Sequence, residues 1–162
     1  MFSPSIKNTI DRWIEVFLIL LMALMVINVS WQVGSRYILN DPSSFTDELA
    51  RYMLIWVGML GAAYVAGKDE HLAIDIVLTK MNPTNRIKTQ MLIHVFVMLF
   101  ALAAMVIGGV NLVYITFILG QNSAALQIPL AYVYVVIPFS GLLVIYYQIS
   151  RIVMLNQELK NS

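Results

Sequence analysis

Apolar residues dominate this chain in long runs that charged residues rarely interrupt. Residues 16–35 contain no Asp, Glu, Lys or Arg, residues 52–67 form a second such run, and residues 89–150 form a third. At about 1.5 Å of helical rise per residue, the first run covers about 30 Å, the thickness of a bilayer's hydrocarbon core. The third run is too long for one helix, and the polar, turn-rich stretch 120–129 divides it. The pattern therefore predicts four transmembrane helices.

Turn signals refine the ends of these helices. The predicted spans cover about residues 13–38, 45–67, 86–119 and 129–154, in a single transmembrane domain that covers residues 1–162. Gly120 suits the end of a helix, and Pro129 suits the first turn of the next one. Residues 70–81 are too few and too charged to cross a bilayer, so we expect a short interfacial helix there. An ordinary connecting loop is the alternative.

Composition agrees with this pattern and excludes several functions. The chain is 60% apolar and only 12% charged, and its mean hydropathy is +0.79. A soluble domain carries about twice that share of charge, so the predicted fold class is an all-α integral membrane protein. A net charge of +1 without a basic run gives no reason to expect nucleic acid. The absence of cysteine excludes disulfides and cysteine chemistry.

The predicted spans also lack the residues that catalysis or ion transport would need. Channels and transporters usually carry ionisable residues within their spans, and the interiors of these spans have no Asp, Glu, Lys or Arg. No nucleotide-binding fingerprint occurs, and we predict no enzyme activity, catalytic residue, metal site or cofactor. His71 and His94 are the two histidines. A haem held by them would instead make the chain a membrane anchor of a respiratory enzyme, and a small autonomous channel is a further alternative.

Basic residues indicate how the chain is oriented in the membrane. With four spans, both termini lie on one side. That side carries Lys7, Arg12, Lys68, Lys80, Arg86, Lys88, Arg151 and Lys160, and the other side carries only Arg36 and Arg51. Because basic residues are retained in the cytoplasm, we expect both termini to be cytoplasmic and the turn after the first span to face outward.

That outward turn is the stretch RYILNDPSSFTDELARY, residues 36–52, which holds five charged residues. Its Asn, Asp and Pro favour a turn. Ser44 suits the N-cap of the next helix, and Asp47 and Glu48 fall in the first turn, where negative charge offsets the positive helix end. Arg51 follows at i+4 from Asp47 and i+3 from Glu48, spacings at which opposite charges attract.

Arg36 and Asp41 have no such local explanation. The short loop brings the ends of two helices together, so we expect Arg36 to reach Asp47 or Glu48 and to lock the first two spans. Separate solvated charges are the alternative. The candidates for interhelical or partner contacts are therefore Arg36, Asp41, Asp47, Glu48 and Arg51.

Small residues recur at helical spacing in the second and third spans. They let helix backbones approach closely in lipid. Packing within this chain and docking against a partner's helices both remain open for them. The helix-packing candidates are Gly58, Gly61, Ala62 and Ala66 in the second span, and Ala104 and Gly108 in the third.

The stretch RYILNDPSSFTDELARYMLIWVGMLGAA, followed by HLAID, closely resembles the small membrane subunit (Q, DctQ-like) of tripartite ATP-independent periplasmic (TRAP) transporters. The similarity covers almost the whole chain. It departs from the family pattern at Phe45, where Trp is common, and at Asp47, where Glu is common. The matching positions are Arg36, Tyr37, Pro42, Phe45, Thr46, Asp47, Glu48, Ala50, Arg51, Tyr52, Trp56, Leu60 and Gly61, with His71 and Asp75 in the surface segment.

The resemblance implies partners and a role. Such a subunit braces a large elevator-type membrane subunit that carries the substrate and Na⁺ sites, in the bacterial inner membrane. A periplasmic binding protein delivers a carboxylated solute, and this chain looks most like sialic-acid systems, with C4-dicarboxylates next. No residue of this chain would touch substrate or hold a cofactor. We further expect the charged outer hairpin to form part of the platform for the binding protein, and a hairpin needed only for folding is the alternative.

Overall fold

The computed structural model describes residues 4–39, 43–68 and 82–161, and this part of the chain is almost entirely helical. The elements are α1 (Pro4–Tyr37), α2 (Ser44–Lys68), α4 (Pro83–Phe100), η1 (Ala101–Gly108), α5 (Gly109–Ile118), α6 (Leu130–Tyr134) and α7 (Val136–Asn161). Four helical stretches are long and apolar enough to cross a membrane. The predicted class, an all-α integral membrane protein, is confirmed. The expected interfacial helix at residues 70–81 and the candidate Asp41 lie outside the described residues.

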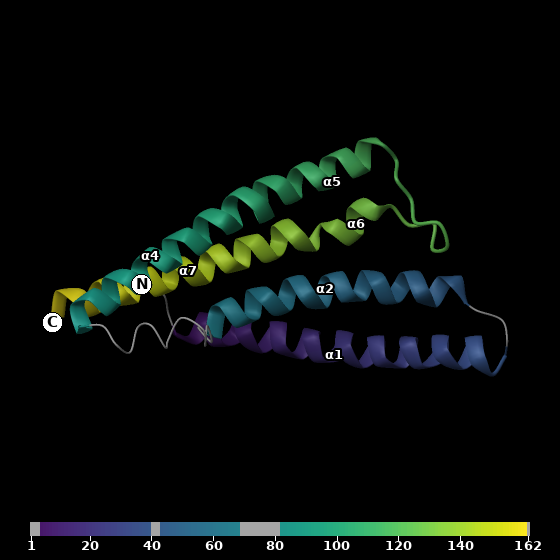
Figure 1. Cartoon of the computed structure of the whole chain (residues 1–162), viewed down its shortest axis with the longest axis horizontal. Helices are drawn as coiled ribbons and strands as arrows, with labels where there is room; N and C mark the ends of the chain where they lie inside the picture. The colour runs from purple at the N-terminus through teal and green to yellow at the C-terminus, as the bar shows by residue number, and fades with distance from the viewer. Residues whose placement is uncertain (1–3, 40–42, 69–81, 162) are drawn as a thin grey trace.

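The helices form two hairpins (Figure 1). One hairpin is α1 with α2, and the other is the continuous α4–η1–α5 rod with α6 and α7. Both chain termini lie at one end of the bundle, which we name the terminal end. The two hairpins lie close together there and diverge toward the opposite end, which we name the loop end because residues 119–129 cross it.

Helix α7 is the centre of the bundle. The largest fully buried side chains, Tyr147, Gln148, Val136 and Ser140, all belong to it. Around it lies a core of Ala63, Ala66, Ala101 and Val144, contributed by α2, η1 and α7. Small side chains in this core let the three helix backbones approach closely. In lipid the hydrophobic effect does not drive helices together, so they associate through close packing of this kind.

Three glycines mark the closest approaches. A Cβ on Gly67 would lie 2.9 Å from the Tyr147 ring, and one on Gly141 would lie 2.8 Å from the Met105 Cβ. A Cβ on Gly109 would lie 2.9 Å from the Pro138 Cδ. None of these three is among the predicted packing residues.

The predicted packing residues divide between the interior and the surface of the chain. Ala66 is buried in the core. A Cβ on Gly58 or Gly61 would meet no atom within 4 Å. Ala62, Ala104 and Gly108 are exposed in the described chain, as is Gly58. The buried small residues of α2 are therefore Ala63, Ala66 and Gly67, and Gly58 and Ala62 lie on its exposed side.

The second hairpin contains two irregularities. The eight residues of η1 form a π-helix within the third span. In the fourth span Pro138 has no N–H to donate to the Tyr134 carbonyl, and the helix is interrupted at Val135, between α6 and α7. The Trp56 indole of α2 donates to the Val133 carbonyl at 3.0 Å. A side chain of the first hairpin thus satisfies a backbone group beside this break.

The loop between α5 and α6 folds back on itself. It begins at Gly120, whose φ of +60° is the left-handed conformation expected at a helix end. The backbone N–H of Ser123 donates to the Ile128 carbonyl at 2.9 Å, and that of Leu130 donates to the Gln121 carbonyl at 2.9 Å. These bonds close residues 121–130 into a compact turn at the loop end.

Candidate functional site: the polar junction at the loop end

The first side chain of the junction is Glu48, the fifth residue of α2. Its carboxylate accepts a hydrogen bond from the Ser123 hydroxyl and one from each of three consecutive backbone amides. The N···O distances are 3.2 Å for Ala124, 3.0 Å for Ala125 and 3.2 Å for Leu126. Figure 1 shows the loop turning down toward the start of α2. Glu48 therefore joins the second hairpin's loop to the first hairpin.

The local structure of the loop arranges the donors that bind Glu48. The loop aligns its amides through a turn in which the Ser123 Oγ also accepts from the Leu126 amide at 3.1 Å. A carboxylate is the natural acceptor for such a group of donors, because hydrogen bonds to an ionised group are the stronger ones. Near a bilayer the contact has a further value, since backbone amides that leave a helix there need a partner.

A second set of contacts ties α1 to α2. The Gln32 amide donates to Asp47 Oδ1 at 2.8 Å, and the Asn28 amide donates to the Thr46 carbonyl at 2.8 Å. Asp47 also forms an ion pair with Arg51. The i, i+4 pair expected from the sequence is therefore present, and the remaining contacts to this turn come from uncharged amides.

Arg36, which was expected to reach Asp47 or Glu48, lies within electrostatic range of Asp47 but forms no ion pair with either carboxylate among the described residues. Within the described residues the ion pair found is Arg51–Asp47, and the Arg36 guanidinium lies 6.0 Å from the centre of the Tyr37 ring. Gln32, one helical turn earlier, occupies the place expected for Arg36. The pattern Asn28, Gln32 could have revealed this, because amides four residues apart in an apolar helix usually face another helix.

The terminal end has its own polar contacts. The Lys7 ammonium donates to the Gly67 carbonyl at 2.9 Å, and the Tyr147 hydroxyl donates to Asp11 Oδ1 at 2.5 Å. Together they connect the start of α1 to the end of α2 and to α7.

Of the two histidines considered as haem ligands, one lies among the described residues. His94 is buried, with its Nδ1 2.5 Å from Gln148 Oε1, and His71 lies outside the described residues. Among the described residues there is no group of three or more His, Cys, Asp or Glu side chains that could hold a metal ion. The hydrogen bonds of the junction connect helices to one another and to the loop.

Four helices that are long and apolar enough to cross a membrane define a multi-pass membrane protein. The family described as "Tripartite ATP-independent periplasmic transporters, DctQ component" matches residues 25–157. The chain belongs to this family, and is thus a TRAP transporter component and not an enzyme. This membership, predicted from the residues of the outer hairpin, is confirmed.

Curated relatives agree with the family. The chain is 33% identical over 79 residues to a putative TRAP transporter small permease protein of Haemophilus influenzae, covering 49% of each chain. It is 27% identical over 103 residues to the sialic acid TRAP transporter small permease protein SiaQ of Vibrio cholerae, covering 64% of this chain and 60% of that one. The chain therefore aligns with about half of the length of the first relative and somewhat more of the second.

A third relative is much larger. The chain is 32% identical over 98 residues to the sialic acid TRAP transporter permease protein SiaT of Haemophilus influenzae, which covers 57% of this chain but 15% of that protein. A segment similar to this chain thus occurs there within a much longer single chain.

Proposed function

We propose that this chain is the scaffold subunit that braces the large, elevator-type membrane subunit of a TRAP transporter. The observation that carries the proposal is the exposure of its helices. In the most apolar 18-residue stretch of α1, no residue is buried within the described chain. In the corresponding stretch of the third span, 11% of the residues are buried. A component with so little internal burial offers wide apolar surfaces to lipid and to a partner, and SiaT supports a permease partner because it contains a segment similar to this chain.

Exposed small residues are the proposed points of closest contact with that partner. Gly58 and Ala62 on α2, together with Ala104 and Gly108 in the third span, have exposed positions in the described chain. Backbones in lipid approach most closely where side chains are small. These positions therefore suit docking by helices of the large subunit, whereas Ala66 serves the chain's own core.

The proposed solute is a carboxylated one, with sialic acid first and a C4-dicarboxylate second. Two relatives carry sialic acid in their names, and this supports the choice. A periplasmic binding protein would deliver the solute, and Na⁺ bound in the large subunit would drive its uptake. In this arrangement the chain lies in the bacterial inner membrane with both termini in the cytoplasm, which agrees with the basic residues at the terminal end.

The loop end would then face the periplasm and the binding protein. The Glu48 carboxylate is hydrogen-bonded to the loop. In such a platform it would therefore position residues 121–127 and would not contact the binding protein itself. Arg36 and Arg51 are exposed in the described chain and remain the basic candidates for direct contact. Asp41 remains an acidic candidate.

Affinity purification from native membranes tests the assembly directly. We expect a much larger polytopic membrane protein to co-purify with the tagged chain, and recovery of the chain alone would contradict the scaffold role. Reconstitution tests the transport. We expect Na⁺-dependent sialic-acid uptake in liposomes to require this chain, the large subunit and the binding protein together. Uptake by this chain alone would contradict the proposal.

A further inference from the structure

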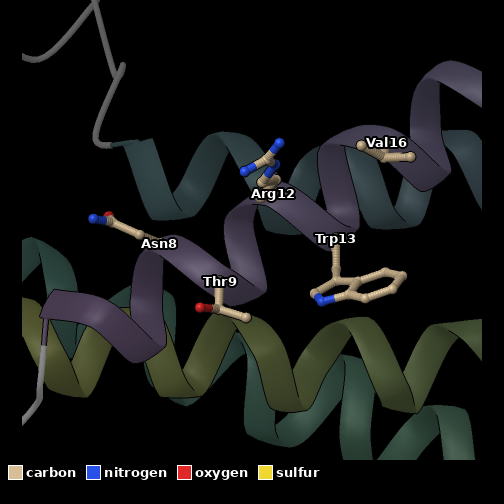
Figure 2. Close-up of a pocket in the computed structure, with 5 residues that line it drawn as sticks. All are labelled: Asn8, Thr9, Arg12, Trp13 and Val16. Carbon is tan, nitrogen blue, oxygen red and sulfur yellow. The ribbon is translucent and has the colours of Figure 1, made fainter.

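A groove of about 660 Å³ lies along the first turns of α1, at the terminal end. Its described lining consists of Asn8, Thr9, Arg12, Trp13 and Val16. Figure 2 shows all five side chains on α1, with Asn8 toward the N-terminus and Val16 toward the middle of the helix. None of these residues takes part in the junction at the loop end.

The polarity of the groove changes along its length. Asn8 and Arg12 offer N–H donors at the end nearest the N-terminus, and the apolar Val16 lies at the other end. Trp13 is 73% exposed. Trp31 follows 18 residues later on the same helix, about 27 Å away by helical rise. That distance places the two indoles near the two surfaces of a bilayer, where tryptophan is favoured, so the groove passes from headgroup depth into acyl-chain depth.

The charge of the groove is available for a ligand. Arg12 is exposed and forms no ion pair among the described residues, although Glu15 lies one turn away. Asp11, its other acidic neighbour in sequence, accepts from Tyr147 instead. The same end of the bundle holds Lys7, Lys68 and Arg151 together with the acidic Asp11. An anion at this end would therefore meet the guanidinium of Arg12, which has no ion-pair partner among the described residues.

We propose that this groove binds an anionic phospholipid, with the phosphate on Arg12 and Asn8 and an acyl chain along Trp13 and Val16. A guanidinium matches phosphate geometry with two parallel N–H donors. Basic pockets beside transmembrane helices recognise anionic headgroups in this way. A free phosphate would use only the polar end of the groove, whereas a lipid uses both ends. The inference requires only that the chain lies in a membrane, and it is independent of the transported solute.

Native mass spectrometry of the full chain in detergent tests the headgroup. Equal amounts of phosphatidylglycerol and phosphatidylcholine would be supplied, and we expect preferential retention of phosphatidylglycerol. Arg12→Gln should weaken that retention about fivefold. Arg12→Lys, which keeps the charge but loses the two parallel donors, should weaken it less than Arg12→Gln does, and the matched control Arg86→Gln should leave it unchanged. Arg86 is also exposed and basic at the terminal end, but is not among the residues that line the groove.

Three results would overturn the proposal. The first is equal loss in Arg12→Gln and Arg86→Gln, which would indicate diffuse attraction to the whole basic end. The second is no preference between the two lipids. The third is displacement of the lipid by millimolar inorganic phosphate, which would make the ligand a free anion.

Photo-crosslinking in native membranes tests the apolar part of the groove. A photoreactive amino acid would replace Val16, and the same residue would replace Val110, which is exposed on α5, as a control. We expect the adduct at position 16 to have the mass of an anionic phospholipid, with a lower yield of that lipid at position 110. An adduct with the mass of a polypeptide would show that a partner protein occupies the groove and would overturn the proposal.

Discussion

The two ends of the bundle are joined by different kinds of contact. At the loop end, one carboxylate on α2 holds the second hairpin through three backbone amides and a hydroxyl. At the terminal end, the backbone of Gly67 lies directly against the ring of Tyr147, and a Cβ at residue 67 would be 2.9 Å from that ring. The first connection is made of hydrogen bonds to a loop, and the second is made of close packing between helices.

This difference follows from the divergence of the two hairpins. Where they lie close, at the terminal end of Figure 1, a glycine permits helix-to-helix contact. Where they separate, contact is kept by a loop that reaches across to a charged side chain. Steric changes should therefore destabilise the terminal end, and changes of hydrogen-bonding capacity should loosen the loop end while the helices stay in place.

The largest effect is expected from Gly67→Ala. The new Cβ would meet the ring of Tyr147, which is 1% exposed and is held at its hydroxyl by Asp11, so the ring has little freedom to move away. Such overpacking costs about 1–3 kcal/mol. We expect the melting temperature in detergent to fall by several degrees, measured by thermal unfolding.

Gly58→Ala is the matched control for this prediction. A Cβ there meets no atom within 4 Å, so the helix should gain about 0.5–1 kcal/mol from the better helix former. An equal fall in both variants would show that α2 needs glycine for a reason other than its contact with Tyr147.

A smaller loss is expected from Tyr147→Phe. It keeps the packed ring and removes the hydroxyl that donates to Asp11 at 2.5 Å. Loss of one such hydrogen bond costs about 1 kcal/mol, or about 2–4 °C for a chain of this size. Tyr132→Phe, at a residue that is 65% exposed, should leave the melting temperature unchanged. If the two variants unfold alike, the hydroxyl is not part of what holds the terminal end.

Local patterns in the sequence predicted the features that depend on neighbouring residues. The apolar runs indicated four spans, and four such helical stretches are present. Gly120 was expected at a helix end and has a positive φ. The Asp47–Arg51 pair forms because two residues four apart on a helix are always neighbours.

Contacts between distant segments could not be predicted in the same way. Glu48 and the amides it binds are 76 to 78 residues apart in sequence, and no periodicity relates them. The small residues of α2 form more than one line along the helix, so the sequence could not show that Ala63 and Gly67 face inward while Gly58 and Ala62 face outward. The charge pattern indicated Arg36 as the partner of Asp47 or Glu48, whereas the side chain of α1 that donates to Asp47 is the uncharged Gln32.

At the loop end, Glu48→Gln should act locally. The amide keeps one acceptor oxygen but loses the charge, so the three loop amides should open more often. We expect the hydrogen exchange of Ala124, Ala125 and Leu126 to accelerate about tenfold, with little change in the melting temperature. Glu158→Gln, at an exposed residue near the C-terminus, serves as the control. Unchanged exchange in Glu48→Gln would mean that the loop holds its shape without the carboxylate.

The smallest effect is expected from Arg51→Gln, although this change breaks the ion pair found within the described residues. The Arg51 side chain is 71% exposed, and exposed ion pairs often contribute nothing measurable to stability. Asp47 also keeps its hydrogen bond from Gln32. We therefore expect a melting temperature within about 1 °C of the wild type at low and at high salt. A salt-sensitive loss as large as that of Tyr147→Phe would show that charge pairing, and not the amide contacts of α1, holds the first hairpin at the loop end.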